Sequence, residues 1–153
     1  MSKGITFEKL NGEGLKIGVV AARWNEEYTS SLRADCVRAL RDTGVSDEDI
    51  VVSEVPGSFE VVLGAKYLLD QGVDAVVAIG CLIKGETMHF EYICDVVSTG
   101  LMQLGTDIGK PVIFGVLTCL TEEQARVRSI GEHNHGYGWG QSAVEMALLG
   151  KQQ

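Results

Sequence analysis

Four short apolar runs, rich in valine and isoleucine, constrain the fold more than any other feature of this sequence. They occupy residues 15–22, 49–55, 74–80 and 111–117. Because polar and apolar residues do not alternate within them, these runs are typical of strands covered on both faces, as in a parallel sheet. We therefore expect a four-stranded parallel sheet at the centre of the fold.

Segments with helical periodicity separate and follow these runs. Apolar residues recur at spacings of three and four, and Gly44 and Gly72 follow two of the segments as C-terminal glycines. After the last strand, Thr121 and Gln124 form a capping-box pattern that starts another helix. The predicted helices cover residues 26–43, 58–71, 86–104, a stretch that begins after Thr121, and about 141–149.

The order of these elements predicts the architecture. Right-handed crossovers between successive parallel strands place helices on both faces of the sheet, which gives an α/β fold of the three-layer αβα sandwich type. With 45% apolar residues and two prolines, the chain is expected to form a single domain over 1–153, with 1–14 as an extended N-terminal segment. Ligands of such sheets bind beyond the carboxyl ends of the strands.

Charge and hydropathy exclude several classes of protein. A net charge of -8 leaves no basic patch for a phosphate backbone, so we expect no nucleic acid partner. No apolar run is long enough to cross a bilayer, and the first 14 residues lack the apolar stretch of a secretory signal. We therefore expect a cytoplasmic protein that does not associate with membranes.

The cysteines and histidines do not predict a metal site. His133 and His135 lie two residues apart, but no third ligand is near them in the sequence. The cysteines are widely spaced, lie inside apolar segments and form no CxxC pair, so buried free thiols are expected. They are Cys36, Cys81, Cys94 and Cys119.

Two motifs follow the first two strands at the expected ligand edge. Trp24 comes directly after the first strand, where an indole can stack on a planar heterocycle, although it can also cover the core. The sequence PGSFE (56–60) follows the second strand. There Gly57 permits a tight turn, and Ser58 is expected to cap the next helix.

The segment GCLIKGETMHFEYIC (80–94) after the third strand carries the most chemical information. Gly85 permits a close turn, and the N–H groups of Glu86 and Thr87, with the Thr87 hydroxyl, are expected to open a helix that binds phosphate. His89 lies in the first turn of that helix, within reach of a ligand held there. We expect it to transfer protons. Either Arg126 or Arg128 could supply a fixed charge for the phosphate.

Six motifs together make the chain resemble the lumazine synthase family, over residues 15–146. The segment around His89 is specific to this family, whereas each of the other motifs would be weak evidence for it alone. They are RWN (23–25), PGSFE (56–60), GCLIKGETMHFEYI (80–93), PVIFGVLT (111–118), EEQARVR (122–128) and GWGQSAVEM (138–146).

The resemblance implies a flavodoxin-like fold and a specific reaction. Lumazine synthases condense 5-amino-6-(D-ribitylamino)uracil with 3,4-dihydroxy-2-butanone 4-phosphate to 6,7-dimethyl-8-ribityllumazine, the penultimate step of riboflavin synthesis. They need no metal and no organic cofactor. The steps are amine attack on a ketone, imine formation, elimination of phosphate and ring closure. These steps require aligned reactants and proton transfer.

The resemblance also assigns roles to residues. Trp24 would stack on the pyrimidine, Glu86 and Thr87 would hold the butanone phosphate with Arg128 as its charged partner, and His89 would transfer protons. The other pyrimidine contacts would come from the PGSFE turn and, through the backbone, from the end of the third strand. These contacts are Ser58, Phe59, Glu60, Cys81, Leu82 and Ile83.

The family pattern further implies an oligomer with shared sites. Phe114 and Arg128 match residues that the family contributes from a neighbouring subunit, so the expected unit is a homopentamer with active sites at subunit interfaces. Twelve such rings can form a 60-subunit shell. The short connection from Arg128 to Trp139 permits the shell, whereas HNHG (133–136) and Trp24 favour the free pentamer. Many relatives have a lysine where this chain has HNHG, and whether His135 replaces it stays open.

Three other functions fit an α/β domain of this size. An FMN carrier would place a phosphate loop after the first strand, but AARWNEEY (21–28) is a poor phosphate cradle. The second alternative is an archaeal-type riboflavin synthase, and the third is a structural shell protein that has lost catalysis. Neither requires the phosphate site that the GETMH segment (85–89) and Arg128 predict.

Overall fold

The four apolar runs form one parallel sheet in the computed structural model, which describes residues 4–153. The strand order is β2-β1-β3-β4, and every neighbouring pair is parallel. The predicted parallel sheet is therefore confirmed. The strands are β1 (Ile17–Ala22), β2 (Ile50–Val55), β3 (Ala75–Ile83) and β4 (Val112–Cys119).

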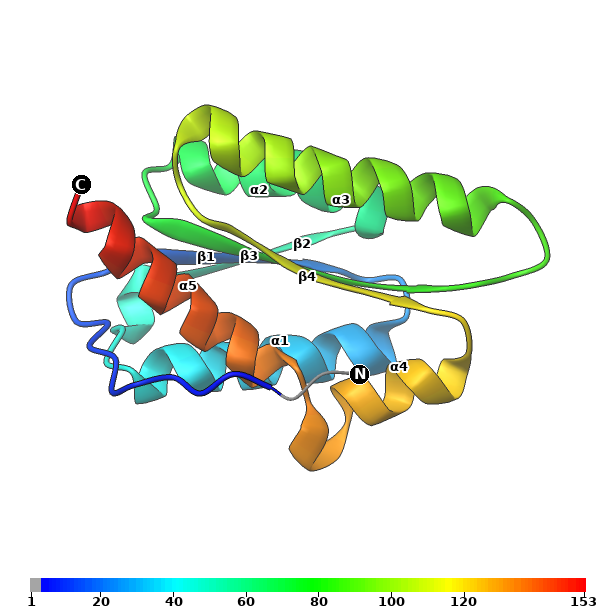
Figure 1. The fold of residues 1–153 in the computed structure, drawn as a ribbon, viewed down its shortest axis with the longest axis horizontal. Helices are drawn as coiled ribbons and strands as arrows, with labels where there is room; N and C mark the ends of the chain where they lie inside the picture. Colours follow the sequence, from blue (N-terminus) through cyan, green and yellow to red (C-terminus); the bar gives the residue numbers. More distant parts are fainter. Residues whose placement is uncertain (1–3) are drawn as a thin grey trace.

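Helices cover both faces of the sheet, which confirms the three-layer αβα sandwich. Figure 1 shows α2 (Val61–Asp70) and α3 (His89–Ile108) on one face of the sheet. It shows α1 (Glu26–Asp42), α4 (Glu122–Ser129) and α5 (Gly136–Lys151) on the other. Short 3-10 turns lie at 47–49, 58–60 and 131–133.

The central strands are more deeply buried than the edge strands. Every residue of β1 is buried, whereas burial alternates along β2, where Val52 is 44% exposed. The expectation that all four strands are covered on both faces is wrong for β2. It lies at the sheet edge, and α1 packs over β1 and β3 instead.

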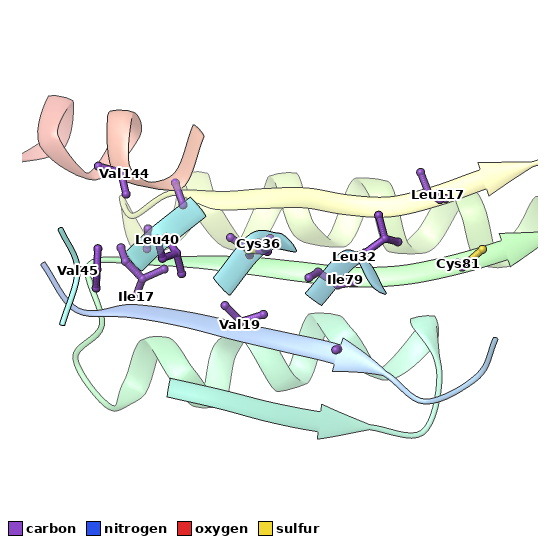
Figure 2. Close-up of a cluster of buried hydrophobic side chains, with 14 of the residues drawn as sticks. Ile17, Val19, Leu32, Cys36, Leu40, Val45, Ile79, Cys81, Leu117 and Val144 are labelled. Carbon is purple, nitrogen blue, oxygen red and sulfur yellow. The ribbon is translucent and has the colours of Figure 1, made fainter. Parts of the chain in front are cut away.

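Two apolar clusters hold the layers together, one on each face of the sheet. Figure 2 shows the cluster between the sheet and α1, where Leu32, Cys36 and Leu40 lie over side chains of β1 and β3. Each fully buried leucine, isoleucine or valine of this kind stabilises the fold by roughly 1.5–3 kcal/mol. The labelled residues from the two strands are Ile17, Val19, Ile79 and Cys81.

Several element boundaries differ from the sequence prediction, and the differences in β3, α3 and α5 bear on the site. β3 continues to Ile83, three residues beyond the predicted strand. Helix α3 starts at His89 rather than at residue 86. It ends at Ile108, and Gly109, whose φ of 74° is left-handed, follows as its cap. Helix α5 starts at Gly136 rather than at residue 141.

The early start of α5 has a packing cause. Its glycines predict a loop, because glycine disfavours helices. In the structure, however, a Cβ at Gly136 would collide with the carbonyl oxygen of Leu32, and one at Gly140 would lie 2.7 Å from the carbonyl oxygen of Cys36. These two glycines therefore let α5 approach the backbone of α1 closely.

The N-terminal segment is only partly covered by the structure. Residues 4–12 form neither helix nor strand, and Leu10 packs against the core beside α1. Gly12 N–H donates to the carbonyl of Thr43 (2.6 Å). Residues 1–3 of the predicted extended segment lie outside the described residues. Within 4–153, no helix has the length and apolar character needed to cross a membrane.

The contact between α1 and α5 predicts opposite effects for two glycines of the same helix. Gly140→Ala should destabilise the fold by about 1–3 kcal/mol, because the new methyl group overpacks the interface. Gly138 faces open space, so Gly138→Ala should be neutral or stabilising by up to about 1 kcal/mol. Chemical denaturation measures both. Equal effects of the two substitutions would contradict the close approach.

Candidate active site

A cavity of about 460 Å³ lies at the carboxyl edge of the sheet, where the sequence predicts the ligand. Its walls come from the turns after β1 and β2, the end of β3 and the start of α3. We call it the strand-end cavity. It contains nine of the predicted site residues: Trp24, Ser58, Phe59, Glu60, Cys81, Leu82, Ile83, Thr87 and His89.

The turn after β1 presents Trp24 to the cavity. Trp24 N–H donates to the carbonyl of Pro56 (3.0 Å), and Arg23 N–H donates to that of Val55 (2.9 Å). The turn is thus fixed to the end of β2. The Trp24 side chain is 74% exposed, so it does not cover the core, and its ring is available for stacking.

The PGSFE turn has a different cap from the predicted one. The Glu60 carboxylate, not the Ser58 hydroxyl, closes the turn by accepting the Gly57 N–H (3.0 Å). Ser58 is buried, and its hydroxyl fills the space where Gly80 lacks a side chain. The capping role predicted for Ser58 is therefore wrong. Its place next to β3 leaves Phe59, 56% exposed, at the cavity wall.

At the end of β3, Cys81 offers its backbone rather than its thiol. The side chain is 1% exposed, and burial, with Cys119 as a smaller cause, raises the pKa of the thiol to about 12. The thiol therefore stays protonated at neutral pH and is not a nucleophile. The Cys81 carbonyl accepts a hydrogen bond from the Asn25 amide nitrogen (2.8 Å).

The loop between β3 and α3 is held at both ends. Lys84 N–H donates to the carbonyl of Cys119 (2.9 Å), and the Lys84 ammonium pairs with Glu91 in the first turn of α3. Within residues 4–153, the N–H groups of Gly85, Glu86 and Thr87 make no hydrogen bond. Three backbone donors are therefore available to an anion.

His89 is the first residue of α3, and its side chain is exposed at the cavity. Its N–H donates to the Thr87 hydroxyl (3.3 Å). The prediction that the helix opens at Glu86 and Thr87 is wrong, because these residues lie in the preceding loop. Glu86 itself does not line the cavity. The loop donors nevertheless directly precede the positive end of the helix in the chain.

Phe114 and Arg128 do not line the strand-end cavity. They lie instead in a second hollow of about 350 Å³, the Arg128 depression, which β4, α4 and the start of α5 form. Arg128 donates to the carbonyl of Gln124 (3.0 Å) and forms no ion pair with the described residues. Arg126 instead pairs with Glu27 (3.1 Å), which leaves Arg128 as the available charge.

His135 lies in the same depression as Arg128. Its N–H donates to the Arg128 carbonyl (2.8 Å), and its ring meets the edge of Trp139 with centroids 6.1 Å apart. Burial lowers the pKa of His135, and the charges of Arg128 and His133 lower it further. The imidazole is therefore neutral at pH 7.

Several lining residues were not among the predicted site residues. Asn25, Phe90 and Ile93 line the strand-end cavity, and Gln124 and Trp139 line the Arg128 depression. Asn25 follows Trp24 directly at a strand end, which is the signal that could have found it. Among the described residues, no group of three or more His, Cys, Asp or Glu side chains could hold a metal ion.

The sheet is parallel and has a cavity at its carboxyl edge, and that cavity is lined by an indole and a histidine. These features are typical of a small-molecule site in an open α/β fold. A family model described as 6,7-dimethyl-8-ribityllumazine synthase matches residues 14–151. The chain belongs to this family, as its motifs predict.

Proteins with the name 6,7-dimethyl-8-ribityllumazine synthase from three organisms are similar over most of their length. Those from Pyricularia oryzae, Schizosaccharomyces pombe and Porphyromonas gingivalis are 42%, 46% and 45% identical to this chain. The alignments cover 96%, 95% and 90% of this chain and 94%, 94% and 87% of the relatives, in the same order.

The lowered pKa of His135 predicts a loss of stability in acid. The unfolded chain carries an ordinary histidine, with a pKa of about 6.5, and so binds more protons than the folded chain as the pH falls through that value. Between about pH 7.5 and pH 5, the wild type should therefore lose more stability than His135→Gln. Thermal unfolding across this range measures the difference. Parallel pH curves for the two proteins would contradict it.

Proposed function

We propose that this protein is a transferase that condenses 5-amino-6-(D-ribitylamino)uracil with 3,4-dihydroxy-2-butanone 4-phosphate to 6,7-dimethyl-8-ribityllumazine. The reaction releases water and phosphate and belongs to riboflavin synthesis. Family membership supports this proposal, and the names of the relatives state the product of the reaction. Cytoplasmic location stays a prediction.

The observation that carries the proposal is the content of the strand-end cavity. The cavity lining includes an exposed indole for a planar pyrimidine, and it includes Gly85 and Thr87, whose N–H groups bond to no described residue and could bind a phosphate. His89 lies at the start of α3, beside the loop that carries these donors. Aligned binding with one proton-transfer group meets the needs of imine formation, phosphate elimination and ring closure.

A second subunit would complete this site. Phe114 and Arg128 face a separate hollow, so they would serve the cavity of a neighbouring copy rather than their own. An exposed apolar groove of about 800 Å³ beside β4 supports an interface between copies, because large apolar surfaces are seldom left uncovered. Its lining includes Met102, Phe114 and Met146. We favour a homopentamer, with the 60-subunit shell as the alternative assembly.

The turn after β1 argues against an FMN carrier. The N–H groups of Arg23 and Trp24 already bond to β2 and to Pro56, so they are not available to a flavin phosphate. Among residues 4–153, the N–H groups of residues 85–87 have no hydrogen-bond partner and Arg128 has no ion-pair partner, which favours a phosphorylated substrate. A riboflavin synthase acting on lumazine alone, or an inert shell, has no use for these groups.

A substrate assay discriminates these functions. Purified protein with both substrates should release phosphate and form 6,7-dimethyl-8-ribityllumazine in equal amounts, whereas lumazine alone should give no riboflavin. Turnover of lumazine alone would support a riboflavin synthase. Stoichiometric FMN absorbance in the purified protein would support a carrier. The absence of any turnover would support an inert shell protein.

His89→Ala should lower kcat by up to about 10²–10⁴, with little change in pyrimidine binding, because the variant loses proton transfer but keeps the cavity. Steady-state kinetics and a separate pyrimidine titration measure the two effects. His133 lines neither hollow, so His133→Ala is the matched control and should retain full activity. Unchanged turnover of His89→Ala at every pH would refute the role.

Arg128→Ala should raise the KM of the phosphate substrate by about ten- to hundredfold, the loss expected for a charged hydrogen bond to phosphate. The KM of the pyrimidine should change little. Arg126→Ala is the control, since Arg126 is engaged with Glu27 on the surface. An equal rise of both KM values in Arg128→Ala would speak against a phosphate contact.

The mass of the assembly tests the shared site. Sedimentation should detect a species near five subunits, the ring size that the family resemblance implies. In such a ring each Arg128 depression would meet a neighbour's cavity. A species near sixty subunits would indicate the shell instead of the free ring, and it would agree with a site shared between subunits. A fully active monomer would disprove sharing.

A further inference from the structure

We propose that Asn25 is a positioning residue for the pyrimidine, because its amide ties the Trp24 turn to the carbonyl of Cys81, near the end of the neighbouring strand β3, at the strand-end cavity. This inference rests on the proposed function and assigns a role to a residue beyond Trp24 in the same turn. Three observations support it: the backbone conformation of Asn25, the hydrogen bond of its side chain, and the position of that bond where the pairing of β1 with β3 ends.

The backbone of Asn25 is unusual. Within residues 4–153 it is the one non-glycine residue with a positive φ, at φ 63° and ψ 46°. This conformation turns the chain from β1 into α1, and the Asn25 carbonyl accepts the N–H groups of Tyr28 (3.0 Å) and Thr29 (3.1 Å). Asparagine is one of the few non-glycine residues that adopt this conformation readily, so the turn accommodates Asn25, and its side chain is free to make a further contact.

The side chain of Asn25 bridges a gap in the sheet. The pairing of β1 with β3 ends at Ala21 and Ile79, and beyond this point β3 pairs only with β4. The Asn25 amide nitrogen crosses the gap to the Cys81 carbonyl (2.8 Å), two residues past the last pair. It therefore replaces the missing ladder bond between the two strand ends.

The bridge fixes two walls of the cavity relative to each other. Trp24 is the neighbour of Asn25 in the chain, and both residues line the cavity with Cys81, Leu82 and Ile83. An indole that is 74% exposed has few contacts of its own to hold it, so its position depends on the turn that carries it. Loss of the bridge should therefore weaken the binding of the pyrimidine, while the phosphate loop at 85–87 keeps its own supports at Lys84.

Two substitutions separate the side chain from the turn. Asn25→Gly permits the left-handed backbone and removes the amide. Asn25→Asp keeps the size of the side chain and replaces the donor with a carboxylate that faces the Cys81 carbonyl. Asn11→Gly is the control, because Asn11 is also a loop asparagine with a local hydrogen bond, to Glu13 N–H, but lies outside the cavity.

The readouts are the KM of each substrate, kcat, pyrimidine binding by calorimetry and the unfolding midpoint. Asn25→Gly should raise the KM and the dissociation constant of the pyrimidine by about tenfold, the size of one net hydrogen bond. Asn25→Asp should raise them further. The KM of the phosphate substrate should stay within about twofold, and Asn11→Gly should match the wild type.

A purely structural role would give a different result. If Asn25→Gly binds the pyrimidine like the wild type, or if both KM values rise together with a lower unfolding midpoint, the positioning role is overturned. Should Asn25→Asp fail to fold, Asn25→Gly still decides the question, since glycine accepts this φ. A wild-type protein that makes no lumazine would instead refute the proposed function, and the role of Asn25 with it.

Discussion

The parallel pairing of β1 with β3 is the constraint on which the cavity depends. The ladder runs from Ile17 and Ala75 to Ala21 and Ile79, and both strands are buried from the two faces of the sheet. After Ala22 the first strand ends, while β3 continues with β4 for three residues more. The offset opens a space at the carboxyl edge that is lined by backbone rather than filled by helix. A sheet whose strands all ended together would leave less exposed backbone for a ligand.

The structure divides the expected active site between two surfaces of one chain. The indole, the backbone of β3 and His89 lie in the strand-end cavity, and Arg128 with Phe114 lies in a hollow of its own. The charge of Arg128 has no carboxylate partner within residues 4–153. An unpaired guanidinium and a loop of unbonded N–H groups are complementary in function, since both favour a phosphate. Their separation is the physical reason to expect a ring rather than a monomer.

Much of this could be predicted from the sequence. The strands followed from apolar composition, and the cavity followed from the rule that places ligands after the carboxyl ends of parallel strands. The position of Trp24 at a strand end predicted stacking on a planar ring, and either Arg126 or Arg128 was a candidate for the phosphate charge. Family resemblance then supplied the pyrimidine as the ring and selected Arg128.

The remaining features depend on contacts between distant residues. The glycines of α5 predict a loop, because their contact with the α1 backbone is visible only when both helices are placed. The Ser58 prediction failed for a similar reason. The local sequence does not show that the Ser58 hydroxyl occupies the space beside Gly80, where a side chain is absent. The hydrogen bond from Asn25 joins residues 56 positions apart, which no local pattern reports.

Mixing two impaired variants tests the shared site most directly, with the phosphate substrate kept far below the KM of Arg128→Ala so that each variant alone is nearly inactive. His89→Ala keeps the Arg128 depression, and Arg128→Ala keeps the strand-end cavity, so a ring that contains both can form some intact sites. Random co-assembly of equal amounts should restore about a quarter of wild-type activity, because one neighbouring pair in four combines the two intact halves. Activity no greater than the mean of the two variants, in rings shown to be mixed, would contradict the account.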